Sequence, residues 1–160
     1  MPASAAAQSG PSPSLKLGLA SYSLREFQRG LAIRMTQKLG VKYINLKEVH
    51  LLYKLSPEDR KKGRAQFDRA GLTITGGGTI YIEKDDDADI KFHFDYARDC
   101  GMPLMVIGAS PASLPKIEKY VKEYDIKVAV HNHGPEDKYF PKPSDALKII
   151  KNMDPRVGVC

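Results

Sequence analysis

One local pattern recurs along this chain: a helix-like segment ends, a glycine or aspartate follows, and a short apolar run begins almost at once. The four junctions are Leu39-Gly40-Val41-Lys42, Ala70-Gly71-Leu72, Cys100-Gly101-Met102-Pro103 and Tyr124-Asp125-Ile126. Glycine suits the left-handed position that closes a helix, and an aspartate takes that place at the fourth junction. Each junction therefore predicts a helix that leads directly into a strand.

The segments on either side of the junctions carry matching periodicities. Apolar residues at helical spacing are Leu31, Met35 and Leu39; Phe67 and Ala70, after a start at Ser56-Pro57; Ile90, Phe94 and Ala97; Leu114, Ile117 and Val121; and Leu147 and Ile150, after a start at Pro143-Ser144. The strands are short and apolar, as in a parallel sheet buried on both faces. With residues 17–20 first and 157–159 last, the sequence predicts a strand and a helix five times, then a sixth strand.

Repeated strand-helix units build either a doubly wound sheet or a (β/α)8 TIM-type barrel. A dinucleotide-binding sheet would place G-x-G-x-x-G after its first strand, where this chain has Ala20-Ser21-Tyr22-Ser23. We therefore predict an α/β fold of the barrel type over residues 15–160. A whole barrel needs about 200 residues or more. The prediction is an incomplete barrel, either a fragment of a longer protein or an open form that pairs with something else.

Composition excludes several classes of protein. No stretch approaches the roughly 18 consecutive apolar residues of a membrane span. The formal charge is +6, but the basic residues are mixed with acidic ones and form no stripe with aromatics, so we expect neither a nucleic acid nor a membrane as partner. The positive charge leaves an anionic substrate open. Cys100 and Cys160 make no disulfide framework, and we interpret both as structural.

Residues 1–14 consist mainly of alanine, serine, proline and glycine, with no charge, and are predicted to be a disordered leader. The run Ala5-Ala6-Ala7 resembles the end of a secretory signal, but the charged and apolar regions that should precede it are missing. We predict a cytoplasmic protein. A periplasmic or exported protein is the alternative, if the leader is the remnant of an export signal.

The residues most suited to chemistry follow the fifth predicted strand. His131 and His133 are spaced i, i+2, so alternation along a strand places both on one side, and a Gly-Pro turn with two carboxylates, Glu136 and Asp137, comes next. The α/β folds carry their sites at such strand ends, which predicts a functional site here; the alternative is a coincidental pair in a polar loop. Neutral imidazole binds Zn, Mn, Fe or Co, so His131 is a candidate metal ligand, accompanied by Glu136 or Glu48.

Two segments carry a family resemblance: Leu17-Gly18-Leu19-Ala20-Ser21-Tyr22-Ser23-Leu24 at the first strand and His131-Asn132-His133-Gly134 at the fifth. With them, residues 15–160 resemble the xylose isomerase-like barrel superfamily, and within it the sugar phosphate isomerases and epimerases. The resemblance implies a small-molecule substrate, a sugar or sugar phosphate. It also implies a divalent metal cofactor (Mn, Co, Zn or Mg) at the mouth of the barrel, held by two Glu, an Asp and a His from later strands.

The resemblance also implies roles for single residues. The fifth-strand ligand is usually a glutamate, and His131 takes that position here. His133 corresponds to a histidine that contacts substrate oxygens beside the metal, and Asn132 between them is a candidate substrate contact. The sixth-strand ligand would follow Cys160, so the resemblance implies that these residues alone do not complete the metal site.

Candidates also stand at three other predicted strand ends. Glu48 and His50 follow the second strand and should share one side; Glu48 is a ligand, a general base, or a loop carboxylate paired with Lys47 or Lys54, and His50 is a candidate substrate contact. The run Gly76-Gly77-Gly78 follows the third strand, and Gly77 is either a close substrate contact or part of a permissive turn. Tyr22 and Tyr81 would stack on a sugar ring or simply pack. The acidic run Asp85-Asp86-Asp87 suits the start of the third helix.

Together these features predict a metal-dependent sugar isomerase or epimerase that moves a proton next to a carbonyl through an enediolate. Glu48, or a group beyond Cys160, would be the base, and His133 would position substrate oxygens. A dehydratase or lyase acting on a keto-sugar is one alternative, and a non-catalytic sugar-binding or assembly protein is another, because fold alone does not choose. A homo-oligomer is compatible with the sequence.

Overall fold

The computed structural model describes residues 15–160, and the leader predicted over residues 1–14 lies outside the described residues. The elements are β1 (Gly18–Ala20), the 3₁₀ turn η1 (Ser21–Leu24), α1 (Arg29–Lys38), β2 (Tyr43–Leu46), the 3₁₀ turn η2 (Glu48–His50), α2 (Pro57–Arg69), β3 (Thr73–Ile82), α3 (Asp87–Cys100), β4 (Leu104–Ala109), α4 (Leu114–Tyr124), β5 (Lys127–Val130), α5 (Pro143–Ile150) and β6 (Val157–Val159). The predicted order of five strand-helix units and a sixth strand is confirmed.

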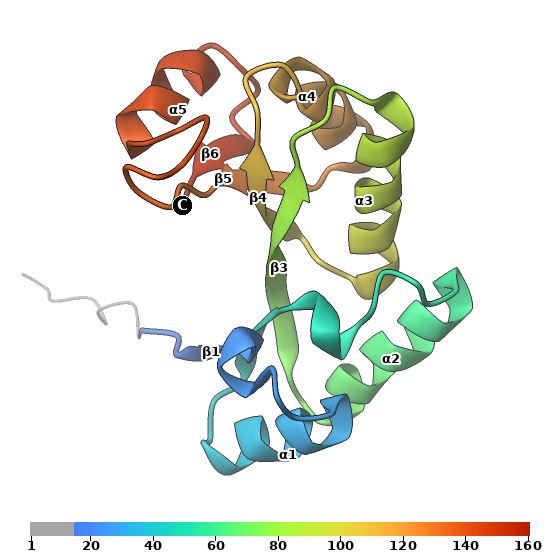
Figure 1. Ribbon diagram of the computed structural model, residues 1–160. Helices are drawn as coiled ribbons and strands as arrows, with labels where there is room; N and C mark the ends of the chain where they lie inside the picture. The colour runs from blue at the N-terminus through green and yellow to red at the C-terminus, as the bar shows by residue number, and fades with distance from the viewer. Residues whose placement is uncertain (1–14) are drawn as a thin grey trace, which may run out of the picture.

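The six strands form one sheet in which every strand pairs in parallel with its neighbour in the chain, in the order β1-β2-β3-β4-β5-β6. A doubly wound sheet would reverse its strand order near the middle. The sequential order belongs to the TIM-barrel type, so the predicted α/β fold class is confirmed. Figure 1 shows the helices following one another in an arc around the strands, from α1 to α5.

The helix ends have the predicted left-handed residues. The backbone φ angles are 74° at Gly40, 71° at Gly71, 68° at Gly101 and 52° at Asp125. A left-handed residue reverses the chain within one or two positions and satisfies the last helix carbonyls, so the next strand begins at once. All four predicted junctions between a helix and a strand are confirmed.

Two helix starts also follow from local capping. The side chain of Ser56 accepts a hydrogen bond from the backbone N–H of Asp59 at 3.1 Å, and Asp86 accepts one from Asp89 at 3.0 Å. Each cap satisfies an N–H group that has no partner inside the helix. The starts predicted at Ser56-Pro57 and within the acidic run are therefore confirmed. Within residues 15–160, none of the helices is long and apolar enough to cross a membrane.

The core lies between the sheet and the helices. Buried strand residues are Ile44, Leu46, Ile80, Ile82, Met105, Ile107, Val128 and Val130, and they pack against Phe67, Ile90, Phe94, Ile117 and Val121 of the helices. In β2 and β5 every second residue belongs to the core, while the residues between them, such as Tyr43 and Asn45, are only half-buried or exposed. The prediction of strands buried on both faces is thus wrong for the described residues, because the helices cover one face only.

Helices α1 and α5 do not bury the predicted apolar stripes. In α1 the exposed fractions of Leu31 and Leu39 are 39% and 63%, and the buried residues are Ala32, Ile33 and Thr36. The face of α1 that is buried therefore carries the small side chains of Ala32 and Thr36, and the larger leucines lie on its exposed side. In α5, Ile150 is buried as predicted, whereas Leu147 is 47% exposed.

The glycine run lies inside β3 and does not follow it, contrary to the prediction. A Cβ on Gly76 would stand 2.7 Å from the carbonyl oxygen of Leu104, and a Cβ on Gly78 would collide with the carbonyl oxygen of Val106. These oxygens belong to the neighbouring strand β4, so the glycines allow two strands to approach each other here.

Candidate functional site

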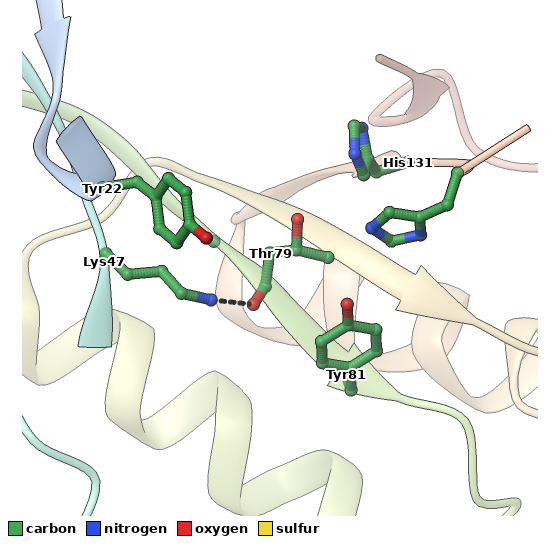
Figure 2. A pocket seen from close by; sticks show the side chains of 7 residues that line it. Tyr22, Lys47, Thr79, Tyr81 and His131 are labelled. Carbon is green, nitrogen blue, oxygen red and sulfur yellow. Dashed lines mark hydrogen bonds between the residues drawn. The ribbon is translucent and has the colours of Figure 1, made fainter. Parts of the chain in front are cut away.

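A pocket of about 450 Å³ opens on the half-buried face of the sheet, where the strands end. Figure 2 shows Tyr22 and Lys47 on one side of it, His131 on the other, and Thr79 and Tyr81 of β3 between them. The residues that line the pocket are Tyr22, Lys47, Gly78, Thr79, Tyr81, His131 and His133. The carboxyl ends of parallel strands are where barrel enzymes carry their sites, so this pocket is the candidate active site.

Ser21 fixes the backbone on the β1–β2 side of the pocket. Its buried hydroxyl accepts a hydrogen bond from the backbone N–H of Lys47 at 2.8 Å. The ammonium group of Lys47 then donates to the carbonyl oxygen of Thr79 at 3.1 Å and lies 3.0 Å from the carboxylate of Glu48. The ends of β1, β2 and β3 are therefore connected through polar contacts beside the pocket.

Lys47 is a pocket residue that our sequence interpretation treated only as an ion-pair partner. Ile44 and Leu46 of β2 are buried against the helices, while Tyr43 and Asn45 lie on the opposite, half-buried face. Lys47 is the next residue in that second alternation. The alternation can be read from the sequence, but placing Lys47 at the pocket requires knowing which face of β2 the helices cover.

The β5 side contributes the two predicted histidines. The rings of His131 and His133 are nearly perpendicular, at 88°, with their centroids 4.8 Å apart. Both line the pocket, as expected for residues on one side of the chain. The backbone N–H of His131 donates to the carbonyl oxygen of Ile107 at 2.9 Å, which holds this end of β5 against β4. The sequence prediction that these two side chains come together is confirmed.

Asp137 organises the loop that carries His133. One carboxylate oxygen accepts the backbone N–H of His133 at 3.1 Å and lies 3.5 Å from Nδ1 of its ring. The other oxygen accepts the backbone N–H groups of Tyr139 and Phe140 at 3.0 and 2.9 Å. Burial alone would raise the pKa of Asp137, but these N–H donors outweigh burial and lower it, so the group is a carboxylate at neutral pH.

Asp137 belonged to the polar residues that we predicted to converge after the fifth strand, but we assigned no role to it. A carboxylate four residues after a histidine, across a Gly-Pro turn, is the sequence signal that was available. A carboxylate beside Nδ1 favours the tautomer in which Nδ1 carries the proton, which leaves Nε2 of His133 as the basic nitrogen. The pair can therefore accept a proton from a ligand in the pocket.

The two predicted tyrosines also lie in the pocket. Each is 54% exposed, so each presents part of its ring to a ligand. The ring of Tyr81 is nearly parallel to that of His133, at 15° with centroids 6.2 Å apart. The guanidinium of Arg25 lies 4.4 Å from the ring centre of Tyr22. Flat, half-exposed aromatic faces are suited to stacking on a sugar ring.

His50 and Glu48 do not lie on one side, contrary to the expected alternation, because the chain forms the 3₁₀ turn η2 there. His50 is buried and does not line the pocket. Its Nδ1 lies 3.0 Å from the hydroxyl of Ser21 and its Nε2 lies 3.2 Å from the carbonyl of Phe27. Burial lowers the pKa of His50. Glu48 is paired with Lys47, the loop-carboxylate alternative considered above, and is not among the lining residues.

Two further predicted substrate contacts lie beside the pocket. Gly77 packs against the side chain of Met102, so a Cβ there would collide with its sulfur, and its neighbour Gly78 is the residue that lines the pocket. The side-chain amide of Asn132 donates to the carbonyl oxygen of Pro141 at 3.3 Å and so holds the loop after β5. Their roles as substrate contacts stay predictions.

The predicted metal ligands lie near each other but form no complete site. His131, His133 and Glu136 line a second pocket of about 260 Å³ that adjoins the first. Over residues 15–160, however, no three His, Cys, Asp or Glu side chains gather closely enough to hold a metal ion. A protein metal site generally uses three or more such ligands. The described residues therefore do not fit the implied metal centre by themselves.

Within the described residues, the larger pocket is lined by hydrogen-bond donors and by one charged group, Lys47, whose ion-pair partner Glu48 lies outside the lining. Its described lining contains the ammonium of Lys47, two imidazoles, two phenols and a hydroxyl, and no carboxylate. Such a set donates hydrogen bonds to oxygen atoms and favours negative charge on them. Chemically, the arrangement can bind an oxygen-rich ligand, accept a proton at a histidine and stabilise an oxyanion.

No protein-family model and no curated protein sequence matches this chain. Among solved structures, it is similar to an uncharacterized protein from Parabacteroides distasonis ATCC 8503, at 24% identity and a TM-score of 0.78. It is also similar to a xylose isomerase domain protein from Alicyclobacillus acidocaldarius (15% identity, TM-score 0.69) and to D-psicose 3-epimerase from Clostridium cellulolyticum H10 with D-tagatose (15%, 0.65).

These superpositions each include 91% of this chain and 62% of the other. The chain thus spans less than two thirds of the length of the structures that it matches. At such identities the similarity establishes the fold, and the chemistry must be argued from the pocket itself.

Proposed function

We propose that this chain, whose fold is that of the xylose isomerase-like TIM-barrel superfamily, is a sugar isomerase or epimerase that transfers a proton next to a carbonyl group. The observation that carries the proposal is the His133–Asp137 pair at the strand-end pocket. A half-buried carboxylate beside an imidazole is an arrangement that general acid–base catalysis uses repeatedly.

In the proposed reaction, Nε2 of His133 removes a proton from the carbon next to the carbonyl. The electron pair of the broken C–H bond forms a carbon–carbon double bond, and the carbonyl electrons move to its oxygen, which gives an enediolate. Return of a proton to the same carbon from the opposite face gives the epimer. Return to the former carbonyl carbon gives the isomer, because the hydroxyl proton of the neighbouring carbon moves to the first oxygen and leaves the new carbonyl group behind. His131 lies beside His133 on the same side of the pocket, so it is suited to returning the proton to the former carbonyl carbon on the same face.

His133 is a better candidate for the base than Glu48, which the sequence also predicted. Glu48 lies 3.0 Å from the ammonium of Lys47 and does not line the pocket. The half-exposed rings of Tyr22 and Tyr81 would hold the substrate, because sugars stack their C–H faces on aromatic rings.

The test is exchange of substrate hydrogen with heavy water. D-fructose and D-tagatose, which occur in structures of D-psicose 3-epimerase, are incubated with the chain in D2O and followed by NMR. We expect deuterium at the carbon next to the carbonyl. Asp137→Asn should lower the exchange rate by about 10²-fold, because His133 loses its positioning carboxylate. The matched control is Asp145→Asn, which changes a half-buried carboxylate that pairs with Lys148 in α5, away from the pocket, and should leave the rate unchanged.

The same samples separate the competing activities. Loss of water or cleavage of the carbon chain, measured as a change of product mass, would replace the isomerase with a dehydratase or lyase. Sugar binding with no deuterium incorporation would replace it with a binding protein. Each sample is run with EDTA and with added Mn2+, which measures metal dependence independently of the residues described above.

A further inference from the structure

We propose that Lys47 is a catalytic residue of this reaction, and that its ammonium group donates a hydrogen bond to the oxygen that becomes negative as the C–H proton leaves. The inference rests on the proposed function, since it names the group that stabilises the enediolate. It concerns a residue outside the histidine loop, contributed by the end of β2.

The position of Lys47 is set by the fold. Its backbone N–H is held by the buried hydroxyl of Ser21, and its side chain is only 17% exposed. The strand alternation of β2 directs it to the pocket face, opposite to the buried Leu46. A side chain held in this way loses little freedom when a ligand binds, which is a condition for electrostatic preorganisation.

The hydrogen bonds of Lys47 leave room for a ligand. An ammonium group has three N–H donors. In the described residues its nitrogen lies 3.1 Å from the carbonyl oxygen of Thr79 and 3.0 Å from Glu48. The bond to Thr79 uses one donor and the ion pair with Glu48 orients the charge, which leaves a donor available to an oxygen in the pocket. Figure 2 shows the contact to Thr79, with Lys47 on the side of the pocket opposite to His131.

The charges around the pocket favour this role. Lys47 is the one lysine or arginine among the described lining residues, and the lining includes no carboxylate. Lys47 therefore supplies the one ammonium group of the described lining, and its ion-pair partner Glu48, at 3.0 Å, stands outside that lining. A charge-assisted N–H···O bond is stronger on an oxyanion than on a neutral carbonyl, so it favours the transition state over the bound sugar.

The step balances without another reactant. His133 takes the proton, the C–H electron pair becomes the new carbon–carbon bond, and the carbonyl oxygen receives the displaced electrons. Lys47 keeps its proton and stabilises the resulting oxyanion. When the proton returns to carbon, the electrons move back to re-form the carbonyl group.

The first experiment measures deuterium exchange into D-fructose and D-tagatose in the presence of EDTA. We expect Lys47→Met to lower kcat by about 10² to 10³-fold and to change KM little, as for loss of one oxyanion donor. Lys47→Arg should keep part of the activity because it keeps the charge and N–H donors. Lys54→Met, which changes an exposed lysine outside the pocket, is the control and should match the unmodified chain.

Chemical rescue separates catalysis from a structural role. Added methylammonium should restore exchange in Lys47→Ala, and tetramethylammonium, which has no N–H donor, should not. Equal rescue by both cations, or an unchanged kcat in Lys47→Met, would overturn the role of Lys47 while leaving the proposed function intact. Absence of exchange in the unmodified chain, both with EDTA and with added Mn2+, would overturn the proposed function itself. Circular dichroism on each variant reports its folding.

Discussion

Ser21 shows how much a single buried hydroxyl contributes to this site. It accepts the backbone N–H of Lys47 and contacts Nδ1 of His50, so one small side chain connects the first turn after β1 to the end of β2. The first contact helps to place Lys47 at the pocket. The second helps to keep the His50 ring in the interior. The hydroxyl of Ser21 thus helps to hold Lys47 at the pocket and His50, three positions later, in the interior.

The buried histidines should make stability depend on pH. Burial lowers the pKa of both His50 and His93 below the ordinary value of 6.5, so the unfolded chain takes up protons first as the pH falls. Their contribution is therefore present above about pH 6.5 and is lost as the pH falls through the lowered folded-state values. We expect a smaller free energy of unfolding in urea at about pH 5 than at about pH 7.5.

The matched variant for this prediction is His50→Asn combined with His93→Asn. Removing both titrating rings should make the free energy of unfolding depend less on pH between the two pH values compared above, although the double variant will be less stable at every pH. An equally steep dependence in the double variant would assign the effect to other groups. The facing charges are Arg29 and Glu48 around His50 and Asp89 beside His93, and they stay in place in this comparison.

At the scale of elements, the strand β3 is the least regular part of the fold. Its glycines face the carbonyl oxygens of β4, and the pairing of β3 with β4 shifts register between Gly78 and Ile80. This segment also lies directly under the pocket, through Gly78 and Thr79. The strands β3 and β4 therefore approach each other closely where β3 lines the candidate site.

Gly78→Ala should be strongly destabilising. The backbone φ angle of 144° disfavours any L side chain, and the new Cβ would collide with the carbonyl oxygen of Val106. We expect a loss of about 3 kcal/mol in the free energy of unfolding, measured by urea denaturation. Gly30→Ala is the control: in α1 its Cβ would meet only Arg34, at 3.8 Å, and should stabilise the helix by about 1 kcal/mol. A similar effect of both changes would contradict this account.

At the scale of the whole molecule, the two cysteines report on folding. Cys100 ends α3 inside the core, and burial raises the pKa of its thiol to about 12, whereas Cys160 is exposed. We expect a thiol reagent to modify Cys160 in the native protein and both cysteines after unfolding, because the thiolate is the reactive form. Cys160→Ser should remove the fast reaction. Rapid native modification of Cys100 would show that the core around α3 opens readily.

The sequence by itself determined the order of the elements and the ends of the helices. The left-handed residues Gly40, Gly71, Gly101 and Asp125 act on their own helix turns, so their effect is local and readable in the chain. The two histidines after β5 were also found in this way, because alternation within one strand needs no partner. These features depend on residues a few positions apart.

Only the tertiary structure decided which faces are covered and which side chains meet. The α1 helix buries Ala32 and Thr36 in place of its leucines, since the fit to the sheet selects the packed face. Lys47 reaches Thr79 across 32 positions of sequence, and η2 turns His50 inward. Such contacts join segments far apart in the chain, and their geometry depends on the packing of the whole sheet and its helices, which no local pattern contains.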